Sequence, residues 1–289
     1  MLQDGICREQ DARIFSNMKI AAISDTHGQL GPIRTAPECD VLVIAGDICP
    51  DFEPSARGSN VVRQRNWLRN DFNRACVEVV ESGRVGHIVL TPGNHDWVFS
   101  EPIGADSFST GFFPDNVHFV NDTSVVIDGV KFYGTPWSLQ FFDWAFMSDD
   151  LALKSVYAKM PNDVDVLVSH GPLHNHGDDV VRVIHRGGRK LEMLEHVGSK
   201  ALAARVAEVM PKYVFTGHIH DASHKVFTMN LAKPVNVVNV SVLDDAYNVV
   251  RQAFTCEHEF SACSGQGAGC GSDEITRCKN KKRNNERTK

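Results

Sequence analysis

The sequence predicts an α/β protein built around parallel strands. Helically spaced apolar residues separate two strand-like runs, and strand–helix–strand order is typical of this class. Several short runs are apolar at nearly every position, as expected of strands covered on both faces. Each of five runs also ends in residues that can bind metals or move protons. These runs are residues 19–24, 41–45, 87–90, 165–169 and 213–216.

Composition excludes several classes of protein. With 289 residues, 42% of them apolar, the chain can bury a core as one large or two small domains. A formal net charge of −6 argues against a general nucleic-acid or anionic-membrane binder. No apolar stretch approaches the roughly 20 residues that span a bilayer. The acidic start lacks the apolar segment of a signal peptide, and the cysteines lack paired spacing before residue 250, so we expect a cytoplasmic protein.

The N-terminal third contains two strand ends with ligand-type residues. Residues 1–17 show no periodicity and are predicted to be a flexible arm. The strand at 19–24 ends in Asp25-Thr-His27, whose two polar side chains point the same way if the backbone stays extended. A connection interrupted by Pro and Gly leaves room for one short helix. The next strand, 41–45, ends in Gly46-Asp47.

A helix and a third strand follow. Apolar residues recur at near-helical spacing from Val61 to Val80, with Ser59 or Asn60 as the cap and Gly83 as the end. The strand at 87–90 then runs into Gly93-Asn94-His95-Asp96, in which glycine permits a sharp turn. Asn94 offers a neutral oxygen, His95 titrates near neutrality, and Asp96 can orient a neighbour.

Residues 97–150 are irregular and rich in aromatic side chains. Residues 123–127 and 130–133 are predicted to form a β-hairpin across the Asp128-Gly129 turn. The aromatic residues have two interpretations, a second-layer core under a long loop or a base-stacking platform beside a site. We favour the core.

The C-terminal half repeats the pattern of strands that end in histidine. Helices are predicted at 151–159, ending before Pro161, and at Ser199–Met210, ending at Pro211. The strand at 165–169 ends in His170, and the strand at 213–216 ends in Gly217-His218-Ile219-His220. Further strands are expected at 235–242 and 247–254. His174 and His176 either line a pocket or are polar loop residues.

Residues 256–289 are predicted to be a disordered tail that contains cysteines and many Lys and Arg residues. Its cysteines Cys256, Cys263, Cys270 and Cys278 are too widely spaced for the tight pairs of common zinc sites. The alternative is a small metal or redox element. Cys49, two residues beyond Asp47, is expected to be buried.

Ligands in sheets of this class gather at the carboxyl ends of strands, so the polar strand ends can converge. They would supply oxygen and nitrogen ligands only, too many for one ion and about right for two if one carboxylate bridges. Asp47, alone at its strand end, is the natural bridge. His95 is left over. The converging residues are Asp25, His27, Asp47, Asn94, His170, His218 and His220.

In order and spacing, these motifs resemble those of the calcineurin-like metallophosphoesterases. The stretches 133–146, 169–172 and 239–241 narrow the resemblance to the metallophosphoesterase-domain-containing subgroup, whose members are described as cyclic-nucleotide phosphodiesterases. The resemblance covers about residues 18–254. It implies that residues 18–255 form one domain with a four-layer fold, two mixed β-sheets packed as a sandwich with helices on the outer faces.

The resemblance also implies roles for individual residues. One metal would take Asp25, His27, Asp47 and His220, and the other Asp47, Asn94, His170 and His218, leaving His95 as the unligated catalytic imidazole. Many relatives carry an Asp three residues after the bridging carboxylate to orient that imidazole, but position 50 is Pro here. Asp51 or Asp96 could take that role. Oxygen and imidazole ligands suit Mn, Fe or Zn, and we expect Mn to be most active in vitro.

The expected function is that of a dinuclear metal-dependent phosphodiesterase acting on cyclic nucleotides or similar small phosphodiesters. Attack by a metal-bridging hydroxide would break the ester, while His95 would either hydrogen-bond a phosphoryl oxygen or give its proton to the leaving group. One alternative is a phosphomonoesterase acting on nucleotides or phosphoproteins. A non-enzymatic alternative is a metal-stabilised scaffold that binds a nucleotide or a protein. The sequence does not indicate the oligomeric state or the native substrate.

Overall fold

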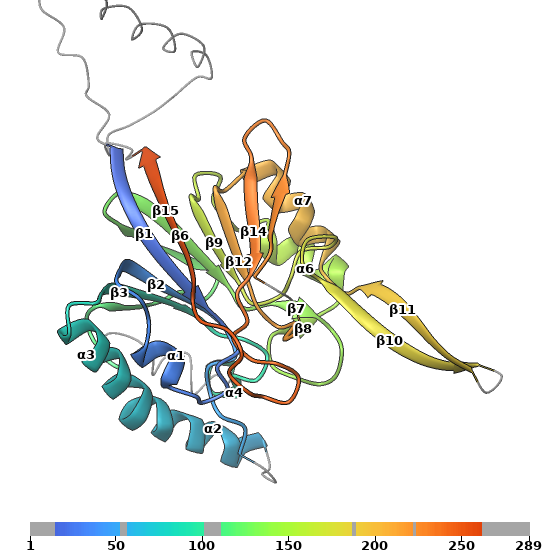
Figure 1. The fold of residues 1–289 in the computed structure, drawn as a ribbon, viewed down its shortest axis with the longest axis horizontal. Helices are drawn as coiled ribbons and strands as arrows, with labels where there is room; N and C mark the ends of the chain where they lie inside the picture. Colours follow the sequence, from blue (N-terminus) through green and yellow to red (C-terminus); the bar gives the residue numbers. More distant parts are fainter. Residues whose placement is uncertain (1–14, 53–56, 101–110, 187–188, 222–223, 262–289) are drawn as a thin grey trace, which may run out of the picture.

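The fold is a sandwich of two mixed β-sheets. The structure, a computed structural model, describes residues 15–52, 57–100, 111–186, 189–221 and 224–261 (Figure 1). The first sheet has the order β15-β1-β2-β3-β4 and the second the order β13-β14-β12-β9-β6-β5. The strands of the first sheet are β1 (Phe15–Ile23), β2 (Cys39–Ala45), β3 (Val85–Thr91), β4 (Val117–Phe119) and β15 (Phe254–Ser261). Those of the second are β5 (Thr123–Ile127), β6 (Val130–Thr135), β9 (Val166–Ser169), β12 (Tyr213–Thr216), β13 (Val226–Met229) and β14 (Val235–Asn239).

Three apolar cores separate four layers, which confirms the predicted architecture. The central core joins the facing sides of the two sheets, with Ile20 and Val43 on one side and Val168 and Phe215 on the other. The outer face of the first sheet packs against α1 (Gly31–Arg34), α2 (Arg57–Trp67), a π-helical turn at Leu68–Phe72 and α3 (Asn73–Glu81). The outer face of the second sheet packs against α6 (Asp150–Tyr157) and α7 (Lys200–Val209).

Alternation along β1 explains why its sequence is apolar throughout. Ile20 and Ala22 belong to the core between the sheets, whereas Ala21 and Ile23 belong to the core beneath the helices. Successive side chains of a strand point to opposite faces, so a strand covered on both sides needs apolar residues at every position. β1, β2, β3 and β4 are parallel, as are β6, β9, β12 and β14. β15, β5 and β13 are antiparallel edge strands.

The predicted helices are present, but the first long one begins at Arg57, before the expected cap, and α6 ends at Tyr157 rather than at residue 159. α2, the π-helical turn and α3 follow one another without a break from Arg57 to Glu81. The Ser199 hydroxyl caps α7 by accepting a hydrogen bond from the Leu202 amide, and Met210 ends that helix in a left-handed conformation. The Asp149 carboxylate caps α6 in the same way through the Ala152 amide.

Several expectations were wrong in detail. The strand expected at 247–254 is a loop up to Ala253, and only Phe254 is in a strand. The arm expected at 1–17 and the tail expected from 256 both overlap strands of the first sheet. β1 already begins at Phe15, and β15 continues to Ser261. The rest of both segments lies outside the described residues. Six elements in the described part of residues 97–196 were not foreseen: α4 (Trp97–Ser100), β4, the short pair β7 (Ser138–Leu139) and β8 (Met147–Ser148), and the hairpin of β10 (Asp179–Arg186) and β11 (Arg189–His196) that projects from the body in Figure 1.

Most of the aromatic residues after β3 form a second-layer core, as favoured from the sequence. Phe99 is buried in the helix-side core of the first sheet, and its ring lies 4.8 Å from that of Phe119 and 6.5 Å from that of Phe113. Trp144 packs against the same core, and its ring also contacts that of His95.

The described helices are all too short or too polar to span a bilayer. The cytoplasmic location stays a prediction.

We predict that the fold depends on β15 but not on the residues beyond it. β15 pairs with β1 over eight residues, from Phe15↔Ser261 to Ala22↔Phe254. A chain that ends at Ala253 should therefore melt at least about 10 °C lower, because the ladder hydrogen bonds are lost. A chain of residues 15–261 should keep the melting temperature of the full chain. Circular dichroism melting compares the three chains, and equal melting of the chain ending at Ala253 would contradict this account.

Candidate metal centre

The carboxyl ends of strands from both sheets meet at one end of the sandwich. The backbone beyond β1 joins the second sheet, because the Ser24 amide donates to Val240 O at 2.9 Å and the Val242 amide to Ser24 O at 3.2 Å. The Asp25 amide donates to Gly46 O at 3.0 Å, which ties the ends of β1 and β2 together. The Gly217 amide donates to His170 O at 3.0 Å and ties β12 to β9 in the same way. The loops that carry the predicted ligands are thus held side by side.

Four of the predicted ligands have a left-handed backbone. The φ angles of Asp25, His27, Asp47 and His218 are 55°, 43°, 50° and 71°. Side chains other than glycine rarely adopt this region, and such residues concentrate at functional sites. This corrects one step of the sequence interpretation, because Asp25 and His27 do not meet on an extended backbone. The chain turns out of β1 with both residues in the left-handed region.

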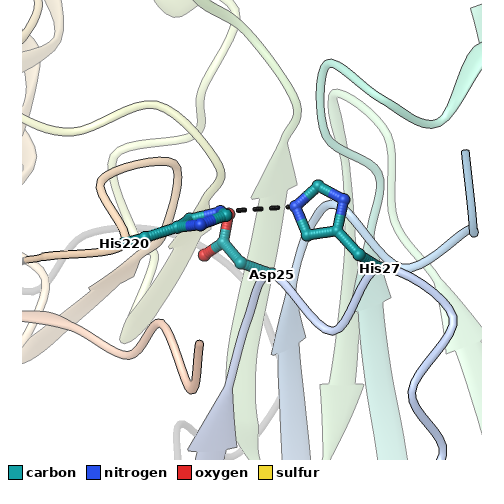
Figure 2. A group of neighbouring side chains, drawn as sticks. All are labelled: Asp25, His27 and His220. Atoms are coloured by element: carbon teal, nitrogen blue, oxygen red, sulfur yellow. Dashed lines mark hydrogen bonds and ion pairs between the residues drawn. The ribbon is translucent and has the colours of Figure 1, made fainter. Parts of the chain in front are cut away.

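The first donor group consists of Asp25, His27 and His220, whose donor atoms lie within 4.8 Å of one another. Figure 2 shows the His27 and His220 rings approaching each other, with the Asp25 carboxylate beside the end of the His220 ring; His27 Nε2 and His220 Nε2 are 3.3 Å apart. His220 Nε2 also lies 3.7 Å from Asp25 Oδ1. The other ring nitrogen of His220 bonds to Asp244 O at 3.2 Å. A metal-ligating histidine usually donates its second N–H to such a carbonyl, which fixes the ring and directs Nε2 into the site.

The second donor group consists of Asp47, His170 and His218. Asn94 adjoins it, with its Oδ1 2.8 Å from His170 Nε2. His170 Nδ1 bonds to Ala45 O at 3.0 Å, so this ring too is fixed by a backbone carbonyl. All seven predicted ligands therefore fall into two neighbouring groups of oxygen and imidazole donors. These donor sets fit divalent cations by their chemistry and by the orientation of their rings.

Asp47 belongs to the second donor group and also faces the first. Its Oδ2 is 3.7 Å from His27 Nε2 and 3.3 Å from His170 Nε2. Its Oδ1 accepts a hydrogen bond from the His95 amide at 2.8 Å. One oxygen thus faces both groups while the other is held by the backbone. This is the arrangement that a bridging carboxylate needs.

Burial and charge set the protonation of the site. Burial lowers the pKa of His27 and of His218 to about 4, so both imidazoles are neutral at pH 7, the form that binds metals. Burial would raise the pKa of Asp47, but the neighbouring His170 and His95 outweigh it and hold that pKa well below its usual range. Burial likewise opposes protonation of His170, yet Asp47 raises the pKa of His170 to about 9. The Asp47 carboxylate is therefore ionised, and its charge is partly balanced by the imidazolium of His170.

His95 has a different environment from the predicted ligands. Its Nδ1 lies 2.6 Å from Asp51 Oδ2, which identifies Asp51 as the carboxylate that orients this imidazole. The donor atoms of His27, Asp51 and His95 also lie within 4.8 Å of one another. Burial lowers the pKa of His95, but attraction to Asp47 and the hydrogen bond with Asp51 outweigh it and raise the pKa to about 9. The Trp144 ring stacks on the imidazole at 4.2 Å, with 28° between the planes.

Asp96, the other candidate to orient His95, forms hydrogen bonds with backbone amides instead. Its buried carboxylate accepts hydrogen bonds from the amides of Ile48, Cys49 and Gly93 at 2.8 to 3.2 Å. It therefore ties the loop after β2 to the loop after β3. The approach of these loops also explains Gly93, because an added Cβ there would lie 2.3 Å from Asp47 Oδ1. The reason for glycine at this position is the lack of space for a side chain, and not the backbone conformation, because the φ of Gly93 is not positive.

Three other residues singled out in the sequence lie outside the donor groups. Cys49 is buried, as expected, and burial raises the pKa of its thiol well above the usual value. His174 Nδ1 lies 3.7 Å from Asp178 Oδ2, and His176 Nδ1 bonds to His174 O at 2.8 Å. The side chains of these two histidines thus contact their own loop, and the His174 ring also contacts that of His196 at the end of β11. Sequence reasoning missed Tyr247, whose ring contacts His27 and His220, because the surrounding segment was interpreted as a strand.

We predict that Asp51 sets the proton affinity of His95. Asp51→Asn removes a carboxylate that favours the imidazolium, so the pKa of His95 in the metal-free protein should fall from about 9 by at least about one unit. NMR titration of the imidazole signals measures this pKa directly. Asp71→Asn, a change at an exposed carboxylate that pairs with Arg74, is the matched control. An unchanged pKa in Asp51→Asn would show that Asp51 does not act on His95.

We also predict that Asp47 is required for both donor groups to bind metal. Asp47→Ala removes the oxygen that faces both groups, so the metal content of the purified protein should fall by at least half relative to Asp71→Ala. Elemental analysis after loading with Mn and gel filtration measures it. Full metal content in Asp47→Ala would remove Asp47 from the site.

Two curated proteins are similar to this chain in sequence. Human metallophosphoesterase domain-containing protein 1 is 27% identical over 223 residues, which cover 70% of this chain and 60% of that protein. A UPF0046 protein of Caenorhabditis elegans is 28% identical over 233 residues, covering 71% of this chain and 52% of its own length. The matches therefore span only about half to three fifths of these relatives.

The fold has a match among solved structures. One crystal structure aligns with a TM-score of 0.56 at 13% identity, covering 86% of this chain and all of the other. At that identity the likeness concerns the fold alone. The family model described as calcineurin-like phosphoesterase matches residues 18–222, well over half of the chain. The chain therefore belongs to the calcineurin-like phosphoesterase family.

Proposed function

We propose that the protein is a metal-dependent phosphoesterase and that its substrates are phosphodiesters, cyclic nucleotides or similar small molecules. The observation that carries this proposal is the position of Asp47, which faces both donor groups, beside the His95–Asp51 pair. Membership of the calcineurin-like phosphoesterase family supports the reaction class. The preference for diesters and for nucleotides rests on the resemblance of the sequence motifs to one subgroup.

The first donor group and Asp47 would hold one divalent cation, and Asp47, Asn94, His170 and His218 would hold the other. Such a pair of cations lowers the pKa of bound water toward neutrality and stabilises charge on the phosphoryl oxygens. The donors are oxygen and imidazole nitrogen without thiolate, a set that suits Mn, Fe or Zn. Cys49, the nearest thiol in sequence to Asp47, is fully buried and hydrogen-bonds through its backbone to Asp96.

His95 is the residue that would give a proton to the leaving oxygen. Its Nδ1 is engaged by Asp51, which leaves Nε2 as the nitrogen that can donate. Its raised pKa keeps the ring protonated at neutral pH in the metal-free protein. Cations beside Asp47 would weaken the attraction of that carboxylate and bring the pKa of His95 closer to neutrality, where a general acid is most effective. Trp144 covers one face of the ring and restricts its orientation.

We predict that activity requires transition-metal ions. Chelation followed by gel filtration should abolish hydrolysis of aryl phosphodiesters, and Mn, Co or Ni should restore it better than Mg, because Mg accepts imidazole ligands poorly. A panel of 2′,3′- and 3′,5′-cyclic nucleotides, aryl diesters and aryl monoesters identifies the preferred class. Full activity in Mg alone would contradict the assignment of these imidazole-rich donor groups as the metal ligands. Faster turnover of monoesters than of all diesters would favour a phosphomonoesterase, and no turnover of any substrate with metal bound would favour a binding scaffold.

We predict that the role of His95 depends on the leaving group. His95→Ala should slow hydrolysis of a cyclic nucleotide by about 10²–10⁴-fold, because a ribose alkoxide needs a proton as the bond breaks. The same variant should lose far less with an aryl diester, whose nitrophenolate leaves unprotonated. Elemental analysis should find metal content equal to that of the wild type.

His118→Ala provides the matched control for the loss of an imidazole, because His118 pairs with His87 on β3 rather than with the donor groups. Its rates should equal those of the wild type. Equal losses on both substrates in His95→Ala would show that His95 positions the phosphate without donating a proton. Loss of metal in that variant would show that His95 is a ligand.

A further inference from the structure

Tyr247 lies in the loop between β14 and β15 and contacts the first donor group. Its ring centroid is 4.7 Å from that of His27 and 5.3 Å from that of His220. It meets the two imidazoles edge to face, with interplanar angles of 71° and 83°. The residue is nevertheless 45% exposed. A large aromatic side chain is thus presented to solvent immediately beside the candidate metal centre. The residue lies outside the segment that the family model matches.

The loop holds Tyr247 in an unfavourable backbone conformation. Its φ is 61°, in the left-handed region, where a bulky side chain is an outlier. The Asp244 carboxylate accepts hydrogen bonds from the amides of Ala246 at 3.0 Å and Asn248 at 2.8 Å. Gln29 Nε2 donates to Tyr247 O at 2.7 Å and ties this loop to the loop that carries His27. Strain that is maintained by the surrounding bonds points to a functional position.

Tyr247 is also the end of a row of four aromatic rings that crosses the site. The centroids follow one another at 4.7 Å from Tyr247 to His27, 4.8 Å from His27 to His95, and 4.2 Å from His95 to Trp144. His95, the proposed donor to the leaving group, stands next to Trp144. Tyr247 stands at the opposite end, beyond His27. His95 and Tyr247 both contact His27, so a diester whose leaving oxygen meets His95 can bring its other substituent within reach of Tyr247.

We propose that Tyr247 is a substrate-binding residue whose ring packs against the ester group that stays on phosphorus, and that it favours aryl or nucleoside groups over alkyl groups there. This inference rests on the proposed phosphodiesterase function. The ring is half-exposed and fixed by its neighbours, so it can cover a planar group with little further loss of side-chain freedom. Aromatic rings and nucleobases gain from such packing beyond the burial of area alone.

Two diesters with one leaving group test the proposal with the Mn-loaded full chain. Bis(p-nitrophenyl) phosphate and methyl p-nitrophenyl phosphate both release p-nitrophenolate and differ only in the group that stays on phosphorus. The wild type should prefer the diaryl substrate. Tyr247→Leu should lower kcat/KM for that substrate by about 3- to 10-fold, mainly through KM, with little change for the methyl ester. Tyr247→Phe, which keeps the ring, should keep the preference.

Two further variants separate binding from a structural role. Tyr247→Gly relieves the left-handed backbone, so its melting temperature should equal or exceed that of the wild type while the preference for the diaryl ester is lost. Val250→Ala removes another exposed apolar side chain from the same loop and should keep the preference. An unchanged preference in Tyr247→Leu would overturn the proposal. So would equal losses on both esters accompanied by loss of metal, because Tyr247 would then only support His27 and His220.

Failure of the proposed function gives a different result. If the wild type hydrolyses neither ester, the phosphodiesterase assignment fails, and Tyr247 is tested by binding instead. Calorimetry with the Mn-loaded protein then compares the Kd of phenyl phosphate with that of methyl phosphate. Tighter binding of phenyl phosphate by the wild type, lost in Tyr247→Leu and kept in Tyr247→Phe, would support a ring-binding role. Equal Kd values in the wild type would overturn it.

Discussion

The structure of the site depends on two buried carboxylates, Asp25 and Asp47, whose exposed fractions are 0% and 2%. An ionised carboxylate away from water is costly unless hydrogen bonds and positive charge compensate. Here the compensation comes from both sheets, because the His218 amide donates to Asp25 and the His95 amide to Asp47. Divalent cations would supply the remaining charge. The sandwich thus creates a concentration of negative charge that favours metal binding.

The sequence predicted the fold class and every residue of the two donor groups for a simple reason. Strands such as β1 and β2 are covered on both faces, so their apolar runs are unambiguous and polar residues at their ends are conspicuous. The four-layer arrangement came from the resemblance of the motifs to a family. Spacing alone does not tell which face of each sheet the helices cover.

The details that escaped prediction are those that tertiary contacts decide. Both Asp51 and Asp96 were candidates to orient His95, and only the approach of the loop after β2 makes Asp51 the partner. Asp96 instead accepts hydrogen bonds from backbone amides of that loop, a role that the local sequence does not indicate. The segment around Tyr247 has strand-like residues, but the hydrogen bonds of Asp244 impose a turn on it. The left-handed backbone at Asp25 and Asp47 likewise follows from contacts between distant loops.

We propose that one oxygen of Asp47, which faces both donor groups, would join two metal sites into a single centre. Electron paramagnetic resonance of the protein loaded with two equivalents of Mn²⁺ tests it most directly. Ions bridged at a separation of about 3.5–4 Å are exchange-coupled and give a multiline spectrum with reduced hyperfine spacing. We predict that coupled spectrum for the wild type. Only the six-line signal of isolated Mn²⁺, with both equivalents bound, would contradict a bridged centre.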